Sequence, residues 1–124
     1  MGIVVHFGDQ IIQELKNFPK PDLDKINAFV QHVRQFGFEN LPGRNKCSDE
    51  VPKDALDWIN KVRYAQMHNL WHYHIGIPYY DADGLWGDQT SRYILHYVKG
   101  DGFIKVVDFN QHPPFCLPTT HYLK

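Results

Sequence analysis

The sequence contains no long hydrophobic run, and this absence argues against a membrane-spanning helix. The longest apolar stretches cover only a few residues, as in Gly2–Val5, whereas a spanning helix needs roughly 20 residues. The N-terminal residues also lack the basic, apolar and small-residue zones of a secretory signal. We therefore expect a protein that stays in the cytosol and has no membrane partner.

Cysteine is scarce, and neither sign of charge is in excess. Cys47 and Cys116 lie far apart without a Cys-x-x-Cys pair, and the cytosol keeps such residues as reduced thiols. The 13 Lys and Arg residues are balanced by 14 Asp and Glu residues, which gives a net charge of −1. Such a chain has no global attraction to nucleic acid or acidic lipid. An RNA-binding function therefore has to depend on a local site.

The sequence also lacks a G-x-G-x-x-G motif, a Walker loop and a nucleophile elbow, each of which would identify a catalytic class. What it does contain is eight histidines and an aromatic content of 15%, both concentrated in the second half. Histidine both accepts and donates a proton near neutral pH. This clustering predicts a functional site in the second half of the chain.

The first half predicts one strand and two helices. The β-branched residues of Ile3–Phe7 favour a strand. Helical spacing of apolar residues follows over Gln10–Phe18. A second helix is expected to begin at Asp22 or Asp24 and to end at Gly37, where a left-handed residue suits a helix C-terminus.

The second half predicts a loop over Leu41–Pro52, a weaker helix through Leu56, Ile59 and Val62, and then three strands. The strands are Trp71–Ile77, Ser91–Val98 and Phe103–Phe109. An exposed aromatic loop, Pro78–Gln89, separates the first two strands, and a Gly-Asp-Gly turn joins the last two.

These elements predict an α+β fold in which an N-terminal strand and helices pack on an antiparallel sheet. The length of 124 residues and the hydrophobic content of 43% are those of one compact domain. We therefore treat residues 1–124 as a single domain.

The predicted strands bring together side chains that can transfer protons. His72 and His74 alternate with Trp71 and Tyr73, so both imidazoles project from one sheet face. The next two strands add Arg92, Tyr93, His96, Lys105 and His112. Metal-free RNA cleavage requires a base for the 2′-OH, an acid for the 5′ oxygen and a cation for the phosphorane. The sequence predicts this site on an exposed concave sheet face, with the opposite face buried under the helix Asp24–Phe36.

Aromatic side chains near these residues offer flat surfaces for unpaired bases. They are Tyr73, Tyr79, Tyr80, Trp86 and Tyr93. An alternative interpretation places the aromatic residues of the loop in a small apolar cluster beneath it. Similarly, Arg92 is open to interpretation as a solvated residue or as an ion partner of Asp88, and Arg44 as a residue that fixes its own loop.

A zinc site is the competing interpretation of the same histidines. The pair His72 and His74, followed by His96 or His112, has the ligand spacing of several His-rich zinc sites. The fold has to place the third ligand, so spacing alone does not decide between the two interpretations.

The chain resembles the RelE/ParE superfamily of bacterial toxins, and within it the YafO family of mRNA interferases. The residues that carry the resemblance are Leu70–Gly76, Arg92–Tyr97, Gly100–Gly102, Ile104–Asp108 and His112. In addition, Pro42–Asn45 is similar to a Gly-Arg loop of that family, and the insert Pro78–Gln89 fits YafO better than the shorter connection of RelE. The resemblance covers Asp22–His112.

The resemblance implies a small sheet flanked by N-terminal helices. It also implies a metal-independent endoribonuclease without a cofactor, which cuts mRNA in the ribosomal A site. The products would be a 2′,3′-cyclic phosphate and a 5′-OH end, and a cognate antitoxin protein would cover the site.

By resemblance, His72 or His74 is the general base, His112 is the general acid and Arg92 holds the phosphate. The expected RNA-binding residues are Arg44, Tyr93, His96 and Lys105, of which Arg44 or Lys105 assists Arg92. Whether Arg92 or Tyr93 faces the site stays open, because a change of register by one residue exchanges the two sheet faces.

A second function that shares this fold is also open. A ParE-like protein poisons gyrase without hydrolysis, and such a binder needs no acid–base pair.

The near-zero net charge fits delivery by ribosome contacts better than capture of free RNA, because phosphate neutralisation supplies most non-specific affinity. We therefore expect weak cleavage of naked RNA.

Overall fold

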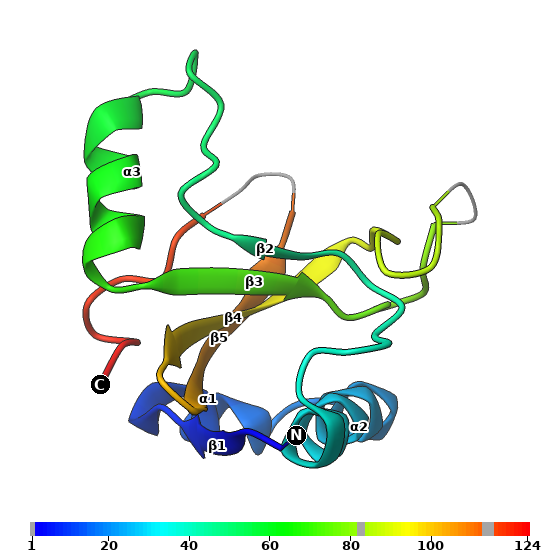
Figure 1. Cartoon of the computed structure of the whole chain (residues 1–124). Coiled ribbons are helices and arrows are strands. Elements are labelled where there is room, and N and C mark those ends of the chain that lie inside the picture. The colour runs from blue at the N-terminus through cyan, green and yellow to red at the C-terminus, as the bar shows by residue number, and fades with distance from the viewer. Residues whose placement is uncertain (1, 82–83, 113–115) are drawn as a thin grey trace.

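The computed structural model describes residues 2–81, 84–112 and 116–124. It contains one five-stranded sheet and three helices (Figure 1). In chain order the elements are β1 (Val4–Phe7), α1 (Asp9–Leu15), α2 (Lys20–Phe36), β2 (Asn45–Cys47), α3 (Trp58–Met67), β3 (Leu70–His74), β4 (Tyr93–Gly100) and β5 (Phe103–Gln111). The predicted α+β class is confirmed. Within the described ranges, no helix is long and apolar enough to cross a membrane.

The strand order in the sheet is β1-β5-β4-β3-β2. β1 pairs in parallel with β5, and all other neighbours are antiparallel. The three predicted strands are present as β3, β4 and β5. The prediction of a loop over Leu41–Pro52 is wrong at its centre, where Asn45–Cys47 pairs with Trp71–Tyr73 as the edge strand β2. Three residues are too few to show a strand period.

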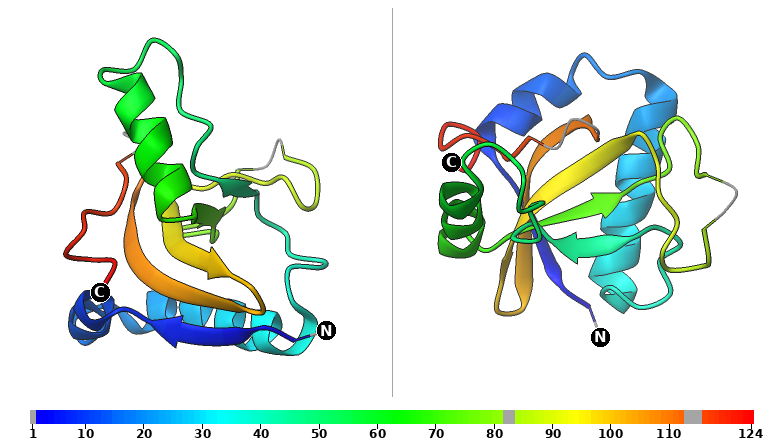
Figure 2. Two further views of the ribbon diagram at one scale, coloured as in Figure 1. Left: turned by 60° about the vertical axis from the view of Figure 1, so that its left-hand side comes forward. Right: turned by 90° about the horizontal axis from the view of Figure 1, so that it is seen from above.

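One face of the sheet packs against α2, as predicted (Figure 2). Phe29 of α2 stacks on Tyr73 of β3 with 4.7 Å between ring centroids. The helix ends at Gly37, whose φ of 69° is left-handed. It begins earlier than predicted, at Lys20, because Pro21 lies in its first turn, where a missing N–H costs no hydrogen bond.

The other face of the sheet is covered at one end by α3 and the C-terminal segment (Figures 1 and 2). The hydroxyl of Tyr64 in α3 donates to the backbone oxygen of Pro118 at 2.6 Å and joins these two elements. The loop 78–89 projects from the sheet beyond the other end of β3 (Figure 1), and its residues 82 and 83 lie outside the described ranges.

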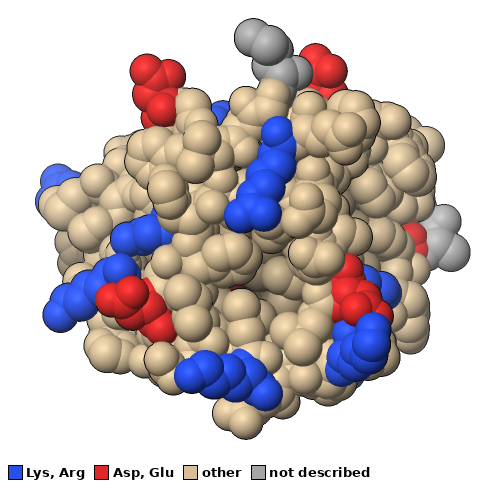
Figure 3. Space-filling view, turned by 90° about the horizontal axis from the view of Figure 1, so that it is seen from below, with Lys and Arg blue, Asp and Glu red and all other residues tan. Residues whose placement is uncertain are grey.

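Basic and acidic side chains are interspersed on the face of the molecule that Figure 3 shows. This distribution agrees with the net charge of −1. Attraction of a polyanion therefore has to come from the immediate surroundings of a site.

Candidate functional site

Four imidazoles meet on the sheet face opposite α2. His72 of β3 is paired with His96 of β4 in register, and their ring centroids lie 6.3 Å apart. The ring of His112 lies 6.2 Å from that of His72 and 5.6 Å from that of His74. His112 follows β5 and continues its ladder, because its N–H donates to the backbone oxygen of Arg92 at 2.7 Å. Histidines from β3, from β4 and from the residue after β5 are thus brought together.

Two cavities of about 700 and 150 Å³ open beside these rings. The larger one is lined by Arg44, His74, Asp81, Thr90, Ser91, Arg92, Gln111 and His112. The smaller one is lined by Arg44, Lys46, Glu50, Pro52, His72, His74 and His112. Arg44, His74 and His112 line both cavities and are the centre of the candidate site.

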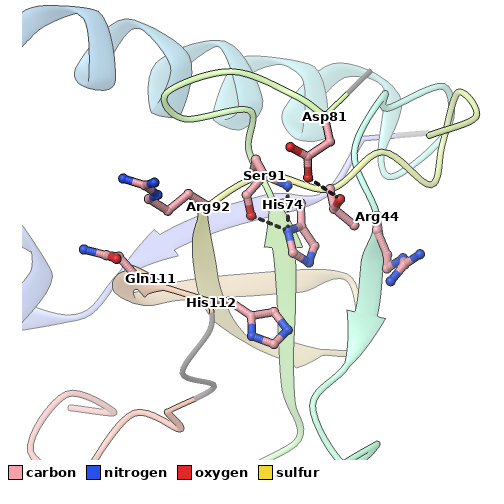
Figure 4. Close-up of a pocket in the computed structure, with 8 residues that line it drawn as sticks. Arg44, His74, Asp81, Ser91, Arg92, Gln111 and His112 are labelled. Atoms are coloured by element: carbon pink, nitrogen blue, oxygen red, sulfur yellow. Dashed lines mark hydrogen bonds between the residues drawn. The ribbon is translucent and has the colours of Figure 1, made fainter. Parts of the chain in front are cut away.

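Figure 4 shows how these side chains are directed. The rings of His74 and His112 face one another, with Arg44 on one side of them and Arg92 on the other. The guanidinium of Arg92 extends away from the two rings. The prediction named Arg92 as the main phosphate ligand, but Arg44 has the more central place.

The expectation of an exposed sheet face is wrong for three of the four histidines. His72, His74 and His96 are only 7%, 4% and 0% exposed. The reason is that residues after β2 cover part of this face, since Ser48 contacts His72 and Pro52 lines the smaller cavity. In addition, α3 and the C-terminal segment cover one end of the face (Figures 1 and 2). His72 and His74 line the cavities, whereas His96 does not.

Burial lowers the basicity of the whole cluster, because the charged imidazolium is poorly solvated there. Burial, with smaller contributions from neighbouring histidines, lowers the pKa of His72 to about 3, and burial lowers the pKa of His96 to about 4. The pKa values of His74 and His112 are also lowered, first by burial and then by nearby charges that include Arg44. Neutral imidazoles therefore predominate at pH 7.

His74 is fixed by the backbone of Ser91. Its Nδ1 lies 2.9 Å from the oxygen and 3.0 Å from the nitrogen of that residue (Figure 4). The unprotonated Nδ1 accepts the N–H, and the protonated Nδ1 donates to the oxygen. The ring is therefore held in the same place in both protonation states, with Nε2 on the other side.

His72 and His96 are fixed by side chains. The Oγ of buried Ser48 lies 2.9 Å from Nδ1 of His72. The Nε2 of His96 donates to Oδ1 of Asn110 at 2.9 Å. Both contacts orient a ring relative to the sheet, as partners of functional histidines commonly do.

Arg44 is positioned by the close approach of two backbone segments. A Cβ on the preceding Gly43 would lie 1.9 Å from the backbone oxygen of His74. This approach lets the N–H of His74 donate to the oxygen of Arg44 at 2.9 Å. The Arg44 guanidinium donates to both carboxylate oxygens of Asp88, at 2.7 and 3.2 Å. Arg44 is thus held at the cavity in a bidentate ion pair.

Three of the four predicted RNA-binding residues, Tyr93, His96 and Lys105, line neither cavity. His96 is 0% exposed, so it has no surface that RNA could contact. Tyr93 lies on the α2 side of the sheet, where its ring stacks on Phe109 with 5.0 Å between centroids. This decides the open question of register, because Arg92 and not Tyr93 lines the larger cavity. Lys105 is in register with His6 and Val98 and lines neither cavity. The prediction of its place was wrong because strand alternation gives a face but not a position along it.

The aromatic loop is divided between the two interpretations. Tyr80 lies beneath the loop. Its hydroxyl contacts the hydroxyl of Tyr73 and donates to the backbone oxygen of His74, each at 2.9 Å. Tyr79 and Trp86 are exposed, at 71% and 64%. Of the expected stacking residues, only these two offer an accessible ring face.

The sequence interpretation missed several lining residues, among them Asp81, Ser91 and Gln111. Asp81 accepts a hydrogen bond from the hydroxyl of Thr90 at 2.8 Å (Figure 4). These residues come from loops and strand ends and follow no period, so no pattern in the sequence indicates them. Asp81 lies in the predicted loop Pro78–Gln89 and Ser91 in the predicted strand Ser91–Val98, but neither prediction indicated a site residue there.

Within residues 2–81, 84–112 and 116–124, no three His, Cys, Asp or Glu side chains are placed to hold a metal ion. Comparison of the chain with models of known protein families, with curated proteins and with solved structures gives no match. The site combines two facing imidazoles with a guanidinium, and such a set can transfer protons beside a bound anion.

Proposed function

We propose that this protein is a RelE-like toxin, an endoribonuclease that cuts mRNA on the ribosome without a metal ion. The observation that carries the proposal is that His74, His112 and Arg44 line both cavities. Two imidazoles allow one to accept a proton while the other donates one. Arg44 is suited to hold the phosphate, since its guanidinium already binds a carboxylate through two hydrogen bonds.

His74 is the better candidate for the general base, because its lowered pKa keeps it neutral and Ser91 holds it in both protonation states. It would accept the proton of the 2′-OH as that oxygen attacks the phosphorus. His112 would donate a proton to the departing 5′ oxygen. The bond from phosphorus to the 2′ oxygen forms as the bond to the 5′ oxygen breaks, so the products are a 2′,3′-cyclic phosphate and a 5′-OH end.

The remaining predicted residues have supporting places in this proposal. His72 lines the smaller cavity but is held by Ser48 and has a pKa of about 3, so it would remain neutral and orient or support the other rings. Arg92, at the far side of the larger cavity, would hold a neighbouring phosphate. Such an activity belongs in the cytosol, with mRNA as substrate and an antitoxin protein to cover the cavities.

The test is alanine substitution of His74 and His112, with His121→Ala as a matched control. His121 is exposed and contacts Gln10, away from the cavities. We expect His74→Ala and His112→Ala each to lower mRNA cleavage by about 100-fold or more, measured by mapping 5′-OH ends in cells, while His121→Ala cleaves normally. Circular dichroism would confirm that the variants are folded. Normal cleavage by both folded cavity variants would refute the proposal.

A ParE-like gyrase poison predicts a different result. Expression would cause DNA damage and filamentation rather than mRNA cleavage, and His74→Ala would leave that effect intact. The same set of strains therefore separates the two functions.

A further inference from the structure

The turn Leu85–Asp88 presents an exposed tryptophan beside the candidate site. The N–H of Asp88 donates to the oxygen of Leu85 at 2.9 Å and closes the turn. Gly87 occupies its third position with φ of 90°, a conformation that favours glycine. Trp86 occupies the second position and is 64% exposed.

The turn is fastened to the segment before β2. The indole Nε1–H of Trp86 donates to Oδ1 of Asn40 at 3.0 Å. The N–H of Gly87 donates to the oxygen of Pro42 at 2.9 Å, and the N–H of Arg44 donates to the oxygen of Gln89 at 2.8 Å. The indole is thus anchored at its nitrogen while its ring stays accessible. Because the ring is already anchored, a ligand that stacks on it restricts the protein little further, and binding costs less conformational entropy.

The same turn carries the ion partner of Arg44. Asp88 is two residues from Trp86, a distance that the backbone spans in at most about 7 Å. Its carboxylate occupies two donors of Arg44, and Arg44 lines the cavities of His74 and His112. A flat apolar surface and an anion-binding guanidinium therefore lie close together at the mouth of the site.

We propose that Trp86 is a stacking subsite for a base of single-stranded RNA whose neighbouring phosphate binds Arg44. The inference rests on the proposed function and adds a contact outside the reacting centre. The phosphate would replace the carboxylate of Asp88, which is exposed to solvent. RNA is favoured over a peptide because Arg44 is shared between this surface and the catalytic histidines. Aromatic stacking is tolerant of base identity, which suits an enzyme that meets many codons.

The test uses oligonucleotides of six adenosines whose riboses are 2′-O-methylated, so that the attacking hydroxyl is blocked. The ¹⁵N-labelled full-length protein gives an indole N–H signal for each tryptophan, and the signal of Trp86 is identified by its loss in Trp86→Phe. We expect the oligonucleotide to shift this signal. The indole of Trp58, which donates to the oxygen of Val51, serves as an internal control and should not move.

Three variants and one further ligand sharpen the result. Trp86→Leu keeps an apolar side chain without a π face and should bind the oligonucleotide about tenfold more weakly. Trp86→Phe should bind with intermediate affinity, and Asp101→Asn, in the exposed β4–β5 turn, should bind normally. Inorganic phosphate should leave the Trp86 signal in place, since it offers no ring to stack.

An unshifted Trp86 signal together with His74-dependent mRNA cleavage would overturn this inference and leave the proposed function standing. Normal mRNA cleavage by folded His74→Ala would instead overturn the proposed function. A Trp86 signal that moves with an acidic aromatic peptide but not with RNA would also overturn the inference, and would identify a protein partner.

Discussion

At the scale of single residues, the two facing histidines determine how the proposed reaction depends on pH. The base has to be neutral and the acid protonated, so kcat/KM rises with pH through the pKa of His74 and falls through that of His112. Both pKa values are lowered from 6.5. We therefore expect the optimum to lie below pH 6.5 on programmed ribosomes, with activity falling from pH 6.5 to 8.

A variant of Arg44 tests the assignment of His112 as the acid, since the charge of Arg44 contributes to the lowered pKa of His112. Arg44→Gln should move the alkaline limb to higher pH even though the rate itself is lower. A flat profile between pH 5.5 and 8 would contradict the assignment of these two histidines.

A second prediction at this scale concerns Asp88. Its carboxylate competes with a phosphate for the donors of Arg44. We expect Asp88→Asn to bind the 2′-O-methylated oligonucleotide about two- to fivefold more tightly at low salt, a range typical of exposed ion pairs. Fluorescence anisotropy of a labelled oligonucleotide measures this, with Asp101→Asn as the control. Weaker binding by Asp88→Asn would mean that Asp88 mainly positions Arg44.

At the scale of elements, the contact between the segment before β2 and the end of β3 holds the site together. An added Cβ at Gly43 meets the oxygen of His74 at 1.9 Å and the hydroxyl of Tyr80 at 2.8 Å. We expect Gly43→Ala to lower the free energy of unfolding by about 1–3 kcal/mol, as overpacking does, and to reduce cleavage because Arg44 moves relative to His74. Urea denaturation measures the first effect.

The comparison for this prediction is Gly102→Ala in the β4–β5 turn. Its φ is 77°, but an added Cβ meets no atom within 4 Å, so only the left-handed backbone is penalised, at about 1–2 kcal/mol. This turn is remote from the cavities, and cleavage should be unchanged in the folded variant. If both variants cleave normally, the close approach at Gly43 does not position the site.

Among the elements, the sequence predicted those whose pattern is set by neighbouring residues. The period of two in β3 placed His72 and His74 on one face, and the apolar stripe of α2 indicated the covered face; both are properties of neighbouring residues. The edge strand β2 was missed because three residues show no period. Asp81 and Gln111 reach the cavity only because distant segments meet. Lys105 was misplaced because strand alternation gives a face but not a position along the strand. Local patterns thus gave the elements and part of the cluster, but not its boundary.

At the scale of the whole molecule, the buried histidines make folding sensitive to acid. His96 has a pKa of about 4 when folded and about 6.5 when unfolded. As pH falls below 6.5 the unfolded chain therefore binds protons that the folded chain does not, and stability is lost. His72, with a pKa of about 3, acts in the same direction. Burial raises the pKa of Asp108 to about 6, so this residue opposes the loss by binding its proton first in the folded state.

The pH dependence of the free energy of unfolding can be tested with His96→Gln, whose amide can still donate to Asn110. Between pH 7 and pH 5 the wild type should lose about 2 kcal/mol through His96 alone, and the variant should not lose that amount, whatever its stability at pH 7. Asp108→Asn should have the opposite effect and steepen the loss, because the compensating carboxyl is gone. Urea denaturation at the two pH values measures both changes. An unaltered difference in His96→Gln would show that His96 becomes charged without unfolding, and that the cluster is more open to water than its burial indicates.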